Sequence, residues 1–151
     1  HPRENYSLKK MVSRMVRFSD YSFAYFEDDA LSREVMQIIM GDAMGVTALR
    51  MFESSENALA HLRTIQPPPD VILLDIHIRP LDGFGVLEAL RADPHLRGVR
   101  VIAVTASVMT DEVDRLREAG FDGAIAKPIS VMTFPDLIER VVSGESVWHI
   151  L

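Results

Sequence analysis

The sequence predicts an α/β domain built on a doubly wound, five-stranded parallel sheet. Three observations favour this class. Short apolar runs alternate with amphipathic segments along the chain, Gly, Pro, Asp and Ser mark the junctions between them, and acidic or polar side chains follow directly after several apolar runs. A run such as 71–74, wholly apolar and closed by Asp75, is typical of a parallel strand that is buried on both faces.

The expected elements follow in a regular order. Strands are expected near residues 22–26, 45–51, 70–74, 100–104 and 121–126, and helices near residues 30–41, 55–65, 84–92, 109–119 and 131–142. Asp82-Gly83 marks a turn before the third helix, Gly120 ends the fourth, and Ser130 is expected to cap the last. Right-handed crossovers between such strands favour the flavodoxin-like order 2-1-3-4-5.

Both ends of the chain lie outside this pattern, so we divide it into an extension (1–20), a domain (21–143) and an apolar tail (144–151). Apolar residues in the extension recur at helical spacing with basic residues between them. This extra N-terminal amphipathic segment is expected to pack on the domain or a partner; contact with a membrane surface, or an expression-derived origin suggested by the leading His1, stays open. Trp148 in the tail is expected to pack back onto a helix.

Length, composition and charge exclude several classes of protein. The 151 residues suit one domain, no apolar run reaches the roughly 20 residues of a membrane span, and no secretory signal is visible. The absence of cysteine excludes disulfides and thiolate chemistry, and we expect a cytoplasmic protein. The net charge is −6, and it is −10 beyond residue 17, which argues against nucleic-acid binding. Beyond residue 17 the chain has ten arginines but a single lysine, Lys127.

Polar side chains follow four of the expected strands at their carboxyl ends. They are Glu27 and Asp28 after the first strand, Asp75 at the end of the third, Thr105 after the fourth and Lys127 after the fifth. The carboxyl ends of parallel strands meet at one edge of the sheet, so these side chains should converge. Gathered carboxylates repel one another unless a cation is present, and oxygen ligands suit Mg²⁺ (or Mn²⁺). A metal beside a carboxylate, a hydroxyl and an amine indicates phosphoryl transfer, with Asp75 as the nucleophile.

At these positions the sequence resembles the receiver domain of two-component response regulators, over roughly residues 21–143. That family has an acidic pair after strand one, a phosphoacceptor aspartate ending strand three, Thr or Ser ending strand four and Lys-Pro after strand five. The elements that match in spacing are Glu27-Asp28, Arg33, Asp75, Asp82-Gly83, Thr105-Ala106 and Lys127-Pro128. One element alone is a weak signal, but the whole set in register is a strong one.

The resemblance implies how the phosphoryl group and the metal are held. Asp75 accepts the phosphoryl group from the phosphohistidine of a sensor histidine kinase or a histidine phosphotransfer protein. Asp28 ligates Mg²⁺ directly, Glu27 does so through water, and the backbone carbonyl of His77 supplies a further ligand. Asp75 itself completes the metal site.

The resemblance also implies how the state of the site is reported. Lys127 pairs with the acceptor carboxylate and then with the phosphoryl oxygens, and Thr105 moves to bond the phosphoryl group. Residues 1–151 hold no recognisable DNA-binding or enzymatic module, so output would follow by contact with a downstream protein or would lie in sequence outside these residues. The domain could be free-standing or excised from a larger regulator or hybrid kinase. A homodimer stays open.

Several positions depart from the family pattern. Receivers usually carry Pro four residues after the acceptor, where this chain has Arg79, followed by Pro80. Ala124 stands where the family often has Tyr or Phe, so signalling by a swinging aromatic ring is not expected. His77 and Ser107 occupy positions that tune the phosphate's lifetime in the family, although a solvated loop side chain is the simpler interpretation of His77.

Two other classes compete with the phosphoacceptor. A receiver-like interaction module that no longer relies on phosphorylation is favoured by Ala124 and by the shifted Pro80, and disfavoured by the intact acids, Thr105 and Lys127. A phosphatase with an aspartyl nucleophile is a more distant alternative, because it would need an acid two residues after Asp75, where this chain has histidine.

Overall fold

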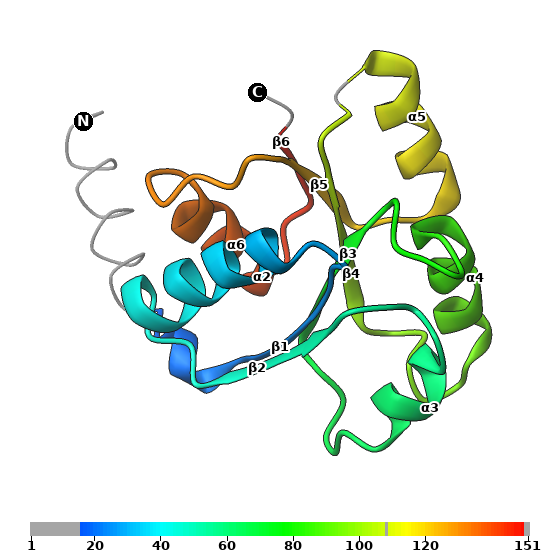
Figure 1. The fold of residues 1–151 in the computed structure, drawn as a ribbon, viewed down its shortest axis with the longest axis horizontal. Coiled ribbons are helices and arrows are strands. Elements are labelled where there is room, and N and C mark those ends of the chain that lie inside the picture. The colour runs from blue at the N-terminus through cyan, green and yellow to red at the C-terminus, as the bar shows by residue number, and fades with distance from the viewer. Residues whose placement is uncertain (1–15, 108, 150–151) are drawn as a thin grey trace.

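The computed structural model describes residues 16–107 and 109–149. Within them the chain forms one parallel sheet with the strand order β2-β1-β3-β4-β5-β6 (Figure 1). The strands are β1 (Ser22–Phe26), β2 (Ala48–Phe52), β3 (Val71–Asp75), β4 (Arg100–Thr105), β5 (Gly123–Ala126) and β6 (Val147–His149). The predicted order of five strands is confirmed, and a short sixth strand extends it at the β5 edge.

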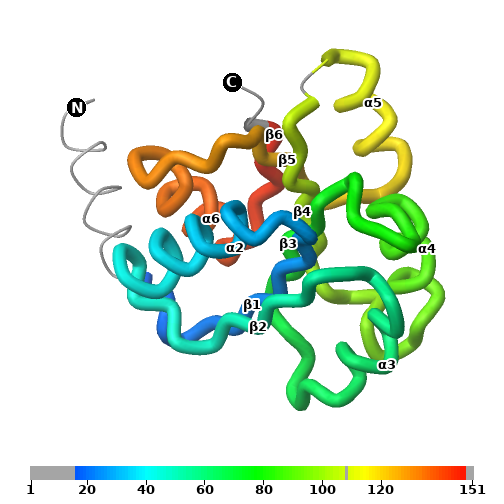
Figure 2. The backbone as a smooth tube through the Cα atoms, in the orientation of Figure 1, coloured from blue at the N-terminus to red at the C-terminus, as the bar shows by residue number. Residues whose placement is uncertain are grey.

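Helices cover both faces of the sheet, as a doubly wound fold requires (Figures 1 and 2). The helices are α2 (Ala30–Gln37), α3 (Ala58–Arg63), α4 (Gly83–Ala92), α5 (Thr110–Ala119) and α6 (Phe134–Val142). A 3₁₀ turn, η1 (Phe18–Asp20), precedes β1, and a π-helical turn, η2 (Ile38–Ala43), continues α2. In both figures α2 and α6 lie on one side of the strands, and α3, α4 and α5 lie on the other.

The core divides into two clusters because alternate strand residues point to opposite faces. The cluster beneath α2 and α6 includes Phe23, Tyr25, Met36, Met40, Leu73, Ile102, Ile125, Ile138 and Val141. The cluster beneath α3, α4 and α5 includes Ala24, Phe26, Leu62, Ile72, Leu74, Leu87, Leu90, Ala103 and Ala124. Every residue of β3 is buried. The strand pairs with β1 on one side and with β4 on the other, so its last residue, Asp75, lies near the centre of the sheet's carboxyl edge.

Capping residues set several helix boundaries as the sequence indicates, and one expectation is wrong. The side chain of Asp82 accepts from the Gly85 N–H at 2.9 Å and caps α4, and Gly120 ends α5 with a φ of 101°. Ser130 does not cap the last helix. Its hydroxyl accepts from Met132 N–H, and α6 begins only at Phe134.

The strand β6 is the part of the fold that the sequence did not predict. It pairs with β5, so that Ala124 lies opposite Trp148. The expected packing of Trp148 against a helix is also seen, since the Arg117 guanidinium of α5 lies 4.6 Å from the centroid of the indole ring. Gly123 permits the pairing, because a Cβ at this position would lie 2.4 Å from the Val147 carbonyl oxygen.

Residues 1–15, which carry most of the predicted amphipathic segment, lie outside the described residues. Just after them, Phe18 of η1 packs against the cluster beneath α2 and α6. Among the helices that are described, none combines the length and the apolar character of a membrane-spanning segment.

Candidate functional site

Asp75 is the last residue of β3, between the carboxyl ends of β1 and β4. Its side chain is buried, because the neighbouring strand ends and loops surround the central strand. Oδ1 accepts a hydrogen bond from the His77 N–H at 3.1 Å, which orients the carboxylate across the edge of the sheet. The second oxygen, Oδ2, faces Lys127.

The acids after β1 approach Asp75 closely. Carboxylate oxygens of Glu27, Asp28 and Asp75 all lie within 4.8 Å of one another. Glu27 is fully buried and Asp28 is exposed, so the cluster has one closed side and one side open to solvent. Three hard oxygen donors that converge in this way fit a divalent cation such as Mg²⁺. The position of the His77 carbonyl oxygen in the ligand set stays a prediction.

Lys127 brings an amine into the acidic cluster. It follows β5, and its backbone N–H donates to the Thr105 carbonyl oxygen at 2.8 Å. Its Nζ atom donates to Oε1 of Glu27 and lies 3.6 Å from Oδ2 of Asp75. One ammonium group therefore lies beside two carboxylates. The cluster has three acids and one amine, so a divalent cation would balance its remaining negative charge.

Tyr25 is a site residue that the sequence analysis missed. Its hydroxyl donates to Oε1 of Glu27 at 3.0 Å, and its side chain is fully buried. Burial, followed by the nearby negative charge of Glu27, raises the pKa of this phenol far above its ordinary value, so the hydroxyl is a neutral donor. Tyr25 lies two residues before Glu27, and residues two apart in an extended chain point to the same face, so a phenol there can reach the acid. This spacing is compatible with the bond but does not by itself predict it.

Asp29 and Arg33 fix the loop that carries the acidic pair. The Asp29 carboxylate accepts from the Ser32 N–H at 2.9 Å and caps α2, and its hydrogen bonds to the Ser32 side chain and backbone hold its pKa below the ordinary value. Arg33 donates to the backbone carbonyl of Glu27 at 2.8 Å and pairs with Glu53. The position of Glu27 is therefore set by backbone contacts as well as by its side-chain partners.

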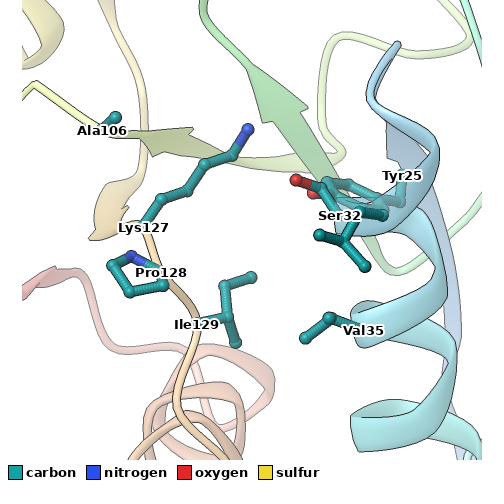
Figure 3. Close-up of a pocket in the computed structure, with 8 residues that line it drawn as sticks. Tyr25, Ser32, Val35, Ala106, Lys127, Pro128 and Ile129 are labelled. Atoms are coloured by element: carbon teal, nitrogen blue, oxygen red, sulfur yellow. The ribbon is translucent and has the colours of Figure 1, made fainter.

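A cavity of about 360 Å³ borders the amine side of the site (Figure 3). Figure 3 shows Ser32 and Val35 of α2 facing Pro128 and Ile129 across the cavity, with Lys127 above them. Most of the lining is apolar, so the lysine amine stands at the boundary between an apolar wall and the acidic cluster.

Thr105 and three of the four predicted modulating residues, His77, Arg79 and Ser107, line a second cavity of about 170 Å³. Thr105 is buried at the end of β4, and its Oγ1 accepts from the Ser107 N–H at 3.1 Å. His77 and Arg79 lie on the same cavity and are exposed. The structure thus brings together Thr105, Ser107, His77 and Arg79, whereas Ala124 is buried below, opposite Trp148.

Ser55 fixes the loop that follows the acceptor, and sequence reasoning gave it no such role. The Ser55 hydroxyl donates to the Leu81 carbonyl at 2.6 Å and accepts from the Leu81 N–H at 2.8 Å. The Ser55 N–H donates to the Arg79 carbonyl at 2.9 Å. These bonds cross from the β2–α3 connection to the β3–α4 loop, so the loop with Arg79 and the shifted Pro80 is held in one defined shape.

A doubly wound sheet with three carboxylates, an amine and a hydroxyl at its carboxyl edge defines the class of signal-receiving domains. The chain belongs to the response regulator receiver domain family, which matches residues 24–141. It is 35% identical over 113 residues to the polar-differentiation response regulator DivK of Brucella ovis. The aligned region covers 75% of this chain and 89% of the relative. It is 34% identical over 114 residues to the DivK protein of Brucella anthropi, with the same coverage.

Solved structures agree with the fold. The signal receiver domain of a histidine kinase from Syntrophus aciditrophicus superposes with a TM-score of 0.70 at 25% identity, over 82% of this chain and 91% of that one. The chemotaxis protein CheY4 of Vibrio cholerae has a TM-score of 0.71 at 20% identity, over 80% of this chain and 98% of that one. The strand β6 lies beyond residue 141, where the family match ends.

Proposed function

We propose that this receiver domain accepts a phosphoryl group on Asp75 from the phosphohistidine of a sensor histidine kinase or a histidine phosphotransfer protein. The observation that carries the proposal is the position of the Lys127 amine, 3.6 Å from the Asp75 carboxylate and bonded to Glu27. An oxygen of Asp75 attacks the phosphorus atom, the P–N bond breaks, and its electron pair returns to the imidazole nitrogen of the donor.

Lys127 and Thr105 would stabilise the charge that the transferring group carries. The ammonium already lies beside the acceptor oxygen, so it needs little movement to reach a phosphoryl oxygen. The Thr105 hydroxyl accepts from Ser107 N–H and keeps its own hydrogen for a phosphoryl oxygen. The Lys127 backbone N–H donates to the Thr105 carbonyl oxygen, so the two residues are held side by side at the edge of the sheet.

Asp28, Asp75 and Glu27 would hold the Mg²⁺ (or Mn²⁺) ion, with the His77 carbonyl as a further ligand. When bound, the ion supplies positive charge that offsets the repulsion between the acidic cluster and the incoming phosphoryl group. The exposed position of Asp28 gives the ion a way in from solvent, while Glu27 closes the buried side.

The domain would then signal by contact with a downstream protein. Its own chemistry would be limited to phosphorylation of Asp75 and loss of that phosphate. The cavity of Thr105, Ser107, His77 and Arg79 lies beside the acceptor and opens to the surface, so its shape can report whether a phosphoryl group is present.

Incubation with Mg²⁺ and acetyl phosphate tests this proposal by intact mass spectrometry. The wild-type chain should gain the mass of one phosphoryl group, and Asp75→Asn should not. Asp114→Asn, on the exposed face of α5, is the matched control and should gain it as the wild type does. A wild-type chain that gains nothing would favour an interaction module independent of phosphorylation.

A further inference from the structure

The Tyr25 hydroxyl is a buried polar group that the proposed function does not use. The ring lies in the core cluster beneath α2 and α6, where phenylalanine would pack as well. The hydroxyl extends from this cluster toward the edge of the sheet and donates to Glu27 at 3.0 Å. Burying a hydroxyl among apolar side chains costs free energy unless it is bonded, so the bond to Glu27 explains how this position accommodates a tyrosine.

Glu27 receives donors on both of its oxygens among the described residues. Oε1 accepts from the Tyr25 hydroxyl and from Nζ of Lys127, and Oε2 lies 3.4 Å from the Asp29 backbone nitrogen. Because the phenol is neutral, it restrains the carboxylate without changing the charge of the site. The phenol and the ammonium bond the same oxygen, Oε1, so the direction of the Glu27 carboxylate is set by both donors.

We propose that Tyr25 is a positioning residue for phosphoryl transfer, an inference that rests on the proposed function. Its hydroxyl orients Glu27, and Glu27 in turn places the Lys127 amine beside Asp75. The same restraint holds Glu27 in the geometry that brings three carboxylates within 4.8 Å for a divalent cation. Figure 3 shows Tyr25 and Lys127 on opposite sides of the cavity. Both side chains bond Oε1 of Glu27, so Tyr25 is linked to the lysine through this acid.

Tyr25→Phe tests the role of the hydroxyl, because it removes one donor and keeps the ring. Glu27 then rotates more freely, and Oε1 binds Lys127 alone. At low Mg²⁺ we expect phosphorylation by acetyl phosphate to slow by about three- to tenfold, the scale of the net contribution of one ordinary hydrogen bond. The Mg²⁺ concentration for half-maximal rate should rise, and the rate at saturating Mg²⁺ should approach that of the wild type.

Tyr21→Phe is the matched control. Tyr21 packs against the same core cluster but directly precedes β1, at the opposite end of that strand from Glu27. The two variants should melt at similar temperatures, and Tyr21→Phe should keep the wild-type dependence on Mg²⁺. A merely structural role for the phenol would move the melting temperature of Tyr25→Phe and leave its dependence on Mg²⁺ unchanged.

The lysine itself gives a measurement that needs no phosphorylation. The chain has three lysines, Lys9, Lys10 and Lys127, so the side-chain NMR signals of Lys127 can be assigned with one substitution. Tyr25→Phe should shift the Lys127 signal without any phosphodonor, and Tyr21→Phe should not. The inference is overturned if the two variants match in both the Lys127 signal and the Mg²⁺ dependence. A shifted Lys127 signal in a protein whose wild type takes up no phosphate would support the placement of the amine by Tyr25 and contradict the proposed function.

Discussion

The Nζ atom of Lys127 lies 3.6 Å from Oδ2 of Asp75, although 52 positions separate the two residues in the chain. β4 lies between the strands that carry them, so the contact spans two strand spacings of the sheet. The amine reaches the acceptor because Glu27, on the far side of β3, binds the same ammonium. The arrangement of the site therefore depends on the register of four neighbouring strands, β1, β3, β4 and β5.

Lys127→Met should slow phosphorylation of Asp75 by about a hundredfold, the scale on which one donor to a developing negative charge acts. The substitution keeps a long apolar side chain but removes the positive charge beside the acceptor. Rates of phosphate uptake from acetyl phosphate, followed by mass spectrometry, check this. Arg140→Met removes an exposed cation from α6 and serves as the control. Wild-type rates in Lys127→Met would show that the amine is not part of the reaction.

Ser55→Ala should lower the free energy of unfolding by about 1–3 kcal/mol, because it removes a buried hydroxyl that bonds both backbone groups of Leu81. Urea denaturation followed by circular dichroism measures the change. Ser54→Ala, whose hydroxyl accepts a longer bond of 3.3 Å from Glu56, should change stability by less. Equal effects of the two substitutions would mean that Ser55 does not hold the β3–α4 loop.

Gly123→Ala should displace β6, because the new Cβ would meet the Val147 carbonyl oxygen. Trp148 is the single tryptophan of the chain, so its fluorescence reports this displacement directly. We expect its emission to shift to longer wavelength as the indole leaves Arg117 and enters water. Gly98→Ala, where a Cβ meets nothing within 4 Å, should leave the spectrum unchanged. An unchanged spectrum in Gly123→Ala would contradict the close packing of β6.

Asp93 should contribute to stability in a way that depends on pH. Its bond to Arg63, followed by the bond from the His95 N–H, holds its pKa below the ordinary value. A lowered pKa in the folded state means that the contribution is present above the unfolded pKa of about 3.9 and is lost as the pH falls through the folded value. The stability difference between wild type and Asp93→Asn should therefore shrink from pH 7 to pH 3. A difference that stays constant over this range would exclude the ionised carboxylate as its source.

The sequence was sufficient for the features that repeat along the chain. Alternating apolar and amphipathic segments predicted the five strands and their order. Charged residues directly after these apolar runs predicted the convergence of Asp75, Glu27 and Lys127, because the carboxyl ends of parallel strands meet at one edge. Contacts between distant loops were not predictable in the same way. Ser55 reads as part of a helix start, and only the fold brings its hydroxyl to Leu81.

Short or locally irregular elements were also beyond the pattern. The strand β6 has three residues, too few for the alternation of a strand to be recognised in the sequence. It can pair with β5 because Gly123 has no side chain to meet the Val147 backbone. Helix α3 begins at Ala58 rather than near residue 55, after Asn57 adopts a φ of 56°. Tyr25 was hidden for a different reason: its ring fits a buried strand, so the pattern does not show that its hydroxyl bonds an acid.

Locating the phosphoryl group after reaction with acetyl phosphate and Mg²⁺ tests the central claim most directly. Borohydride reduces an aspartyl phosphate to homoserine, which peptide mass spectrometry then assigns to one position. The account predicts homoserine at position 75 and at no other aspartate. Homoserine at Asp28 or elsewhere, or none at all in a folded protein that binds Mg²⁺, would contradict it.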